Sequence, residues 1–257
     1  MAGFASYLSY QNFAESVRTR WRYAGDTEQV AFLEALLATS VTRQEVIHSG
    51  SNLWRAQLGQ DLYSTDDISG EQQPAPLGVH RMKPLPDRAR EGRANPRGIP
   101  YLYLSTRQET AMAEVRPWVG SHVSIGQFTL KRDVRLLNFV TDDHRIMAYP
   151  QEPEPEERER AVWQDIDRAF SQPITSAEDS ADYAPTQRIA EFLRAKGLDG
   201  IAYGSSFGPG HNVALFDTEA ARQLNCRLFE IVGVKFEWRE AANGYCVTVP
   251  VEDKTEK

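Results

Sequence analysis

Residues 99–115 read IPYLYLSTRQETAMAEV, and this stretch decides how the rest of the chain is interpreted. Its first half alternates aromatic and aliphatic residues. The alternation predicts a strand with Tyr101 and Tyr103 on one face and Leu102 and Leu104 on the other. The alanine-rich second half predicts a helix. A strand that runs directly into a helix presents one face at the mouth of the turn, which is a common position for a functional site.

The start of this helix and its one acidic residue near the apolar side are the next features. Thr106 and Glu109 have the spacing of a capping box, which predicts that the helix begins directly after Thr106. Ala111 and Val115 form its apolar side, and Glu114 lies near that side. A buried carboxylate is costly unless it is paired or has a function, so Glu114 is a candidate catalytic residue. The alternative is an ordinary exposed helical glutamate.

Composition sets broad limits on the function. The chain has 257 residues, of which 41% are hydrophobic and 25% charged, and its net charge is −7. An acidic chain repels nucleic-acid backbones, so no nucleic-acid partner is expected. Two cysteines form neither a disulfide framework nor a zinc site, and they fit a reducing compartment. Neither a signal peptide nor an apolar run of membrane-spanning length is found, so we expect a cytoplasmic protein with no membrane partner.

The chain is expected to have two parts. In the first, residues 1–50, Phe13 and Val17 recur at helical spacing and Asp26 can cap a second helix, which predicts a small helical extension. Residues 51–257 mix both periodicities and predict an α+β domain. Helices are expected over 161–170 and 185–197, and residues 64–98 form a long irregular segment. Strands are expected over 53–58, 122–130, 134–140, 199–203, 212–216, 228–236 and 245–251.

Two irregular segments carry candidate binding residues. The segment HRMKPLPDRAREGRANPRG, residues 80–98, concentrates cations in an acidic chain, and guanidinium groups bind phosphate well. Within it, Arg93 and Asn95 are candidates for binding phosphate or placing an incoming nucleophile. The loop after residue 203 offers Ser205 and Ser206, whose hydroxyls can bind a ligand. The alternatives are a solvated loop and ordinary turn chemistry.

Several familiar sites are missing from the sequence. It contains no G-x-S-x-G elbow, no phosphate-binding P-loop, and no histidines at metal-ligand spacing, so no metal is expected. Arg43 and His48 form R-x4-H, which resembles the signature of the HEPN ribonucleases. That fold is an all-helical bundle longer than the helical segment available here. A ribonuclease acting through the N-terminal helices is therefore kept only as an alternative.

Three blocks together resemble a known family. They are LWRAQ, GRANPRGIPYLYLSTRQETAMAEVRPWVG and DGIAYGSSFGPGHNVALF, in that order within residues 53–217. The chain resembles the RES domain family, named for shared Arg, Glu and Ser residues. The resemblance implies an α+β fold of twisted sheets like that of ADP-ribosyltransferases, around a cleft for NAD. It also implies an NAD-consuming toxin that uses phosphate or water as acceptor, with ADP-ribosyl transfer to a macromolecule as the alternative.

The resemblance assigns the catalytic residues one by one. The family's Arg falls on Arg55, its active-site Tyr on Tyr103, its Glu on Glu114 and its Ser on Ser205. Arg55 would grip the pyrophosphate, Tyr103 would flank the nicotinamide ring, and Glu114 would stabilise the positive charge on the ribose. Further binding candidates are Tyr101, Arg93, Asn95 and Ser206.

Two positions depart from the family pattern. Trp54 stands where members often have Tyr, and Gly204 stands where they often have Pro. The second change leaves the choice between Ser205 and Ser206 open.

The implied partners are small molecules and one protein. NAD is expected as a substrate, with inorganic phosphate as a candidate co-substrate and no prosthetic group. The family also implies an antitoxin or immunity protein, which nothing in this sequence identifies. A binding module that keeps the cleft without turnover is a further alternative. Retention of the Arg, Tyr, Glu and Ser pattern argues against it.

Overall fold

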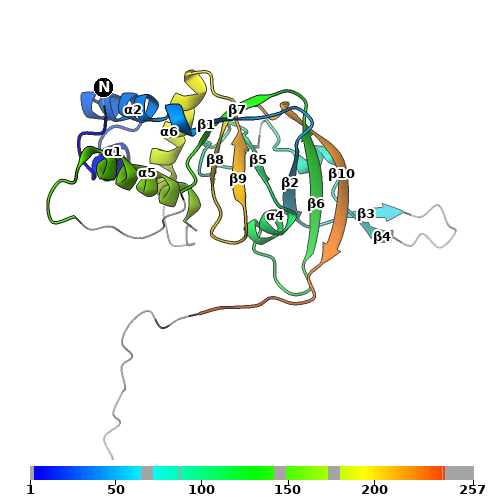
Figure 1. Ribbon diagram of the computed structural model, residues 1–257. Coiled ribbons are helices and arrows are strands. Elements are labelled where there is room, and N and C mark those ends of the chain that lie inside the picture. Colours follow the sequence, from blue (N-terminus) through cyan, green and yellow to red (C-terminus); the bar gives the residue numbers. More distant parts are fainter. Residues whose placement is uncertain are drawn as a thin grey trace, which may run out of the picture.

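A computed structural model gives the fold of the chain (Figure 1), and it describes residues 3–64, 72–86, 88–141, 149–172, 180–238 and 240. The α-helices are α1 (Ser9–Thr19), α2 (Thr27–Thr39), α3 (Val79–Met82), α4 (Gln108–Glu114), α5 (Pro155–Ser171) and α6 (Ala184–Ala195). The strands are β1 (Gln44–Ile47), β2 (Asn52–Leu58), β3 (Asp61–Ser64), β4 (Gln72–Ala75), β5 (Leu102–Ser105), β6 (His122–Leu130), β7 (Val134–Asn138), β8 (Gly200–Gly204), β9 (His211–Leu215) and β10 (Ala221–Glu230). The α+β class is thereby confirmed.

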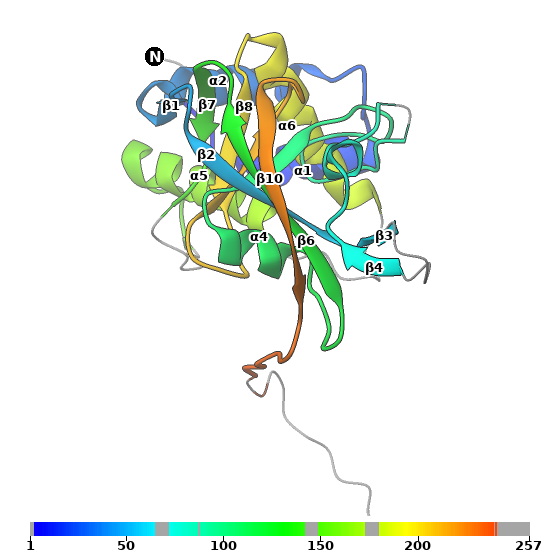
Figure 2. The same ribbon diagram turned by 90° about the vertical axis from the view of Figure 1, so that its right-hand side faces the viewer.

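Eight of these strands form one mixed sheet in the order β1-β7-β8-β9-β5-β2-β6-β10. Only the β7–β8 pair is parallel within this sheet. Strands β3 and β4 form a separate hairpin, which projects from the edge of the molecule (Figures 1 and 2). The long separations between neighbouring strands mean that most of the sheet is held by contacts distant in sequence.

The sheet curls so that its two halves pack against each other. Leu102 and Leu104 of β5 belong to one hydrophobic cluster together with Leu53 of β2 and Phe128 of β6. The opposite face of β5, with Tyr101 and the partly buried Tyr103, packs against the helices. The predicted alternation of tyrosine and leucine along this strand is therefore confirmed. The helices pack on one half of the sheet, and that half packs on the other half, so the three form successive layers.

The N-terminal helices are part of this helical layer. Figure 1 shows α1, α2, α5 and α6 gathered on one side of the sheet. Phe13 and Val17 of α1 and Phe32 of α2 share one buried cluster with Trp163 of α5 and Ile189 of α6. The expected cap of the second helix is present, since Asp26 Oδ1 accepts the N–H of Gln29 at 2.8 Å. The division of the chain at residue 50 stays a prediction.

The helix α4 differs from the sequence prediction at its start. It begins at Gln108, and no side chain caps it. The Thr106 hydroxyl instead accepts the N–H of His211 at 3.1 Å and donates to the His211 carbonyl at 3.2 Å. The capping-box prediction was wrong because the β9 backbone, distant in sequence, competes for the same hydroxyl. Ala111 still packs against Ala56 of β2, as the apolar side of the helix requires.

One strand prediction was displaced, and a segment expected to be irregular contains regular elements. Of the strand expected over 228–236, only residues 228–230 belong to β10, which starts at Ala221 and ends at Glu230, so the prediction was wrong for residues 231–236. Residues 72–75 and 79–82, within the segment expected to be irregular, form β4 and α3. The strand expected over 245–251 lies outside the described residues. Within the part of the chain that the structure describes, no helix is long and apolar enough to cross a membrane.

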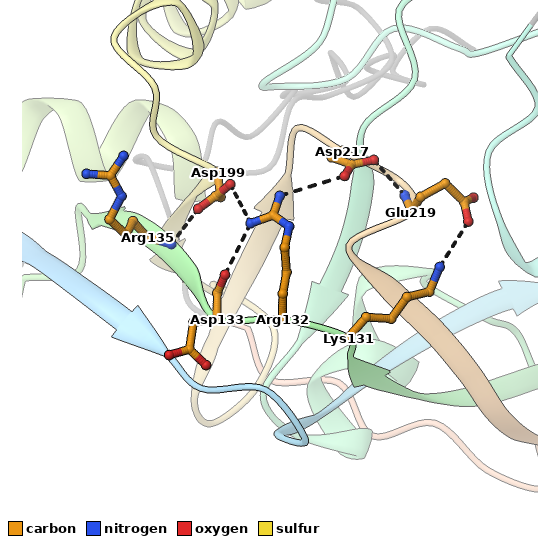
Figure 3. A network of polar contacts seen from close by, with 7 residues as sticks. All are labelled: Lys131, Arg132, Asp133, Arg135, Asp199, Asp217 and Glu219. Atoms are coloured by element: carbon orange, nitrogen blue, oxygen red, sulfur yellow. Dashed lines mark hydrogen bonds and ion pairs between the residues drawn. The ribbon is translucent and has the colours of Figure 1, made fainter.

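Charged side chains connect three turns at one end of the sheet (Figure 3). Arg132 Nη1 donates to Asp199 Oδ1 at 2.7 Å, which joins the β6–β7 turn to the segment that precedes β8. Lys131 binds Glu219 at 3.2 Å and so reaches the β9–β10 turn. Glu219 also binds Lys83 at 2.9 Å. Through Glu219, the network anchors the start of the basic segment to the sheet.

The close packing of β8 against its neighbours gives a direct test of this sheet. Gly200 begins β8, and a Cβ there would collide with the carbonyl oxygen of Ala214 and lie 2.9 Å from a methyl group of Leu136. Because backbone cannot move aside cheaply, we expect Gly200→Ala to lower the free energy of unfolding by about 1–3 kcal/mol. Denaturant unfolding measures this loss. Gly233→Ala, at an exposed position with open space around its Cα, is the control, and equal stability of both variants would contradict the sheet register.

Candidate active site

A cavity of about 540 Å³ lies where the two halves of the sheet meet. Strands β2 and β5 are paired at one position only, Trp54 with Ser105. Beyond this position, β2 is paired with β6, while β5 is paired with β9. Residues of both strands line the cavity, and the cavity volume is in the range of small-molecule sites.

The described lining of the cavity is positively charged and aromatic. Its cations are Arg55, Arg81, Lys83, Arg88, Arg90 and Arg93, and its anions are Glu91 and Glu114. Its aromatic residues are Trp54, Tyr101, Tyr103, Tyr183 and Tyr203. A chain with a net charge of −7 thus concentrates positive charge in one concave site. Such a site attracts an anionic ligand that carries flat rings.

Glu114 is held by hydrogen bonds through one of its two carboxylate oxygens. Its Oε1 atom accepts the Ser205 hydroxyl at 2.8 Å and the Asn212 amide at 2.6 Å. No hydrogen bond to Oε2 is found among the described residues. The half-buried carboxylate is therefore fixed in direction and keeps one oxygen for a ligand.

The amide of Asn212 is itself oriented by a second buried side chain. Ser105 Oγ donates to Asn212 Oδ1 at 2.6 Å, so the amide nitrogen must point towards Glu114. Asn212 and Ser105 are only 5% and 4% exposed. They are paired residues of β9 and β5, which brings them together on one face of the sheet. Sequence reasoning did not single out either residue.

The two serines of the glycine-rich loop have different surroundings. Ser205 contacts Glu114, whereas the Ser206 hydroxyl donates to the Ser171 carbonyl at 2.9 Å, and neither serine is part of the cavity lining. Gly204 holds this loop because its N–H donates to the buried carboxylate of Asp167 at 3.1 Å. Proline, which the family often has at this position, lacks that N–H. The geometry favours Ser205 over Ser206, and the roles of both stay predictions.

Arg55 is a partly buried cation, and none of its contacts within the described residues is to an acidic side chain. Its Nη1 donates to the Tyr103 carbonyl at 2.9 Å, and its buried Nε has no hydrogen-bond partner. No ion pair to Arg55 is found in the described part of the chain. Burial lowers the pKa of the Arg55 guanidinium to about 10, and the nearby Tyr103 offsets only part of this effect. An anion bound in the cavity would supply the remaining compensation.

Tyr103 and Asn95 contact each other and organise the loop that carries Arg93. The Tyr103 hydroxyl donates to Asn95 Oδ1 at 2.7 Å and accepts the Ala94 N–H at 3.0 Å. The Asn95 amide nitrogen donates to the carbonyls of Arg90 and Ile99, at 2.9 and 2.8 Å. The polar atoms of both side chains are thus engaged inside the protein. The Tyr103 ring still lines the cavity, and direct ligand binding by Asn95 stays a prediction.

The remaining candidates lie on the cavity wall. Arg93 lines the cavity and makes a long contact to the Ala169 carbonyl, 3.4 Å from Nη1. Tyr101 is 2% exposed, and its ring packs against Phe216 with a centroid distance of 4.9 Å. Among the described residues, no group of three or more His, Cys, Asp or Glu side chains is placed to hold a metal ion.

The two residues of the R-x4-H pattern make separate contacts. Arg43 stacks over the ring of Trp163, 4.6 Å from its centroid, while exposed His48 contacts Asp133 at 3.2 Å. Neither residue lines the cavity. The structure thus gives no support to a nuclease site at these positions.

Comparison with known proteins identifies the family of the chain. Residues 52–230, well over half of the chain, match the RES domain family. The chain belongs to the RES domain family. A similar solved structure is the crystal structure of the M. tuberculosis MbcT–MbcA toxin–antitoxin complex, with 12% identity and a TM-score of 0.42, covering 76% of this chain and 92% of that one. No match was found among curated proteins.

The hydroxyl of Tyr103 offers a test of how the Arg93 loop is held. In Tyr103→Phe, Asn95 Oδ1 and the Ala94 N–H lose their partner inside the protein. Leaving buried polar atoms unpaired costs about 1–3 kcal/mol, so we expect the free energy of unfolding to fall by that amount. Thermal and denaturant unfolding measure it. Tyr23→Phe, at an exposed tyrosine, is the control, and unchanged stability of Tyr103→Phe would contradict the role assigned to the hydroxyl.

Proposed function

We propose that this RES domain protein is a toxin that degrades NAD by cleaving the bond between nicotinamide and ribose, with phosphate or water as the acceptor. The proposal rests on family membership and on one structural observation. The same cavity holds a partly buried guanidinium that has no ion-pair partner among the described residues, and a carboxylate fixed at one oxygen. A dinucleotide carries a pyrophosphate for the first group and a ribose for the second.

The unpaired cation favours a phosphate-containing ligand. A buried charge without a partner destabilises the protein, and an anion that binds it removes that cost. Guanidinium groups pair well with phosphate, and Arg55 lines the cavity. Arg90 and Arg93 add positive charge to the same cavity. Aromatic side chains of the lining offer flat surfaces for the nicotinamide and adenine rings.

Glu114 would stabilise the charge that forms during cleavage. When the glycosidic bond breaks, its electron pair stays on the nicotinamide nitrogen, which becomes neutral, and positive charge builds on the ribose carbon. A carboxylate oxygen aimed at this carbon or at a ribose hydroxyl stabilises the charge, and Oε2 is the oxygen left for this. Phosphate or water then bonds to the carbon through oxygen, and water releases one proton.

A protein partner follows from this activity in the cell. A protein that consumes NAD would harm the cell that makes it unless something blocks the cavity. We include in the proposal an antitoxin or immunity protein that covers the cavity mouth, where the cations of the basic segment lie. Such a partner would present acidic groups to them.

The products formed from NAD test the proposed reaction. We expect the purified protein to release nicotinamide from NAD, because the cavity combines sites for pyrophosphate and ribose. Chromatography of reactions with and without inorganic phosphate identifies the acceptor. A phosphorylated ADP-ribose that forms only with phosphate means phosphorolysis, and free ADP-ribose without phosphate means hydrolysis. Release of nicotinamide only when a protein acceptor is added would instead support ADP-ribosyl transfer, and no release under any condition would overturn the proposal.

Glu114→Gln removes the negative charge at the reacting centre and keeps the shape of the side chain. A glutamine Oε1 can keep both hydrogen bonds from Ser205 and Asn212, so the variant should fold normally. Loss of the negative charge should lower the turnover rate by roughly 10²–10³-fold. Steady-state kinetics of nicotinamide release measures the loss.

The matched control is Glu109→Gln, on the exposed side of the same helix and outside the cavity. It should retain full turnover. Full NAD turnover by a folded Glu114→Gln protein would contradict the mechanism.

A further inference from the structure

Among the tyrosines that line the cavity, Tyr103 and Tyr203 differ in what their hydroxyls contact. The Tyr103 hydroxyl donates its only proton to Asn95 and accepts the N–H of Ala94. A tyrosine hydroxyl has one proton to donate, so Tyr103 has none left for a ligand while this loop is intact. The resemblance to the family nevertheless places the active-site tyrosine at Tyr103.

Tyr203 has the opposite arrangement. It lies on β8, is 5% exposed and lines the cavity. Across the described residues, no hydrogen bond to its hydroxyl is found. The hydroxyl oxygen of Tyr203 is not fully buried, so the cavity leaves it able to donate a hydrogen bond to a ligand.

The sheet register places Tyr203 beside the reacting centre. Tyr203 of β8 is paired with Asn212 of β9, and Asn212 is paired with Ser105 of β5. These three residues form a row across neighbouring strands, and all of them line the cavity. Since Asn212 donates directly to Glu114, Tyr203 is one strand away from the residue that holds the carboxylate.

We propose that Tyr203, and not Tyr103, is the tyrosine whose hydroxyl binds the substrate, by donating a hydrogen bond to an oxygen of the ribose-phosphate held beside Glu114. This inference rests on the proposed function. Tyr103 then acts as a positioning residue, through Asn95 and the loop of Arg93. The family pattern has one active-site tyrosine, whereas here Tyr203 binds the substrate and Tyr103 positions the loop.

The electrostatic surroundings of Tyr203 agree with a neutral donor. Burial raises the pKa of the Tyr203 hydroxyl well above its usual value, and the nearby Tyr103 and Glu114 raise it further, while Arg93 opposes them. The hydroxyl therefore keeps its proton throughout the physiological pH range. A neutral hydroxyl can donate a hydrogen bond to a sugar or phosphate oxygen while it keeps its proton.

Tyr203→Phe tests the inference because it removes only the hydroxyl and keeps the ring, which lies 5.7 Å from the Phe170 ring between centroids. We expect kcat/KM for NAD to fall roughly 5- to 10-fold, mainly through KM, because the bond is made in the bound ground state as well. The unfolding temperature should stay the same or rise, since no partner inside the described protein is lost. Tyr103→Phe should instead lower the unfolding temperature.

Two further measurements keep the outcomes apart. Calorimetry of NAD binding to Glu114→Gln, with and without Tyr203→Phe, should show a Kd weakened by a similar factor. The control is Tyr10→Phe, at a buried tyrosine of the N-terminal helices outside the cavity. It should change neither kcat/KM nor Kd for NAD.

Wild-type kinetics and binding by Tyr203→Phe would overturn the inference while leaving the proposed function in place. Activity that falls only in proportion to the folded fraction would also overturn it. If wild-type protein neither cleaves nor binds NAD, the proposed function fails and the Tyr203 inference fails with it.

Discussion

The site depends on the single pairing that joins β2 to β5. Trp54 and Ser105 hold the two halves of the sheet together at one point, and each half is otherwise paired with strands of its own. A continuous ladder between β2 and β5 would bring the two backbones within hydrogen-bonding distance along their length. The cavity is the space gained by leaving that ladder incomplete. Ser105 takes part in this pair and also orients Asn212, which ties the architecture of the sheet to the direction of Glu114.

Polar groups around this opening fall into two kinds. Some are satisfied within the protein, as in the chain from Ser105 through Asn212 to Glu114 and in the contact of Tyr103 with Asn95. Others, the guanidinium of Arg55 and the hydroxyl of Tyr203, have unused hydrogen-bonding capacity in the described protein. The first kind fixes geometry and the second kind is left for a ligand. This separation is typical of a preorganised site, where supporting residues hold the groups that touch the substrate.

Much of the fold could be predicted from local pattern, and most of the supporting residues could not. The strand over 122–130 was predicted with its observed bounds, because its apolar residues and flanking turns are contiguous in sequence. Asn212 and Tyr203 lie in a segment that was predicted as strand and loop, but their importance comes from the pairing of Asn212 with Ser105, about a hundred residues away, and of Tyr203 with Asn212. The capping box at Thr106 failed for the same reason, since a distant backbone competes for its hydroxyl. Local spacing does not reveal which remote strand arrives beside a residue.

The shared core of the N-terminal helices has a consequence for how this protein can be compared and divided. The stretch that matches the RES domain family starts at residue 52, yet Phe13 and Phe32 are buried in the same cluster as Trp163 and Ile189. Strand β1, which also precedes the match, adds an edge to the main sheet through β7. The first residue of the family match therefore lies within one hydrophobic core. In this chain the stretch that matches the family is shorter than the part of the chain that forms the common hydrophobic core.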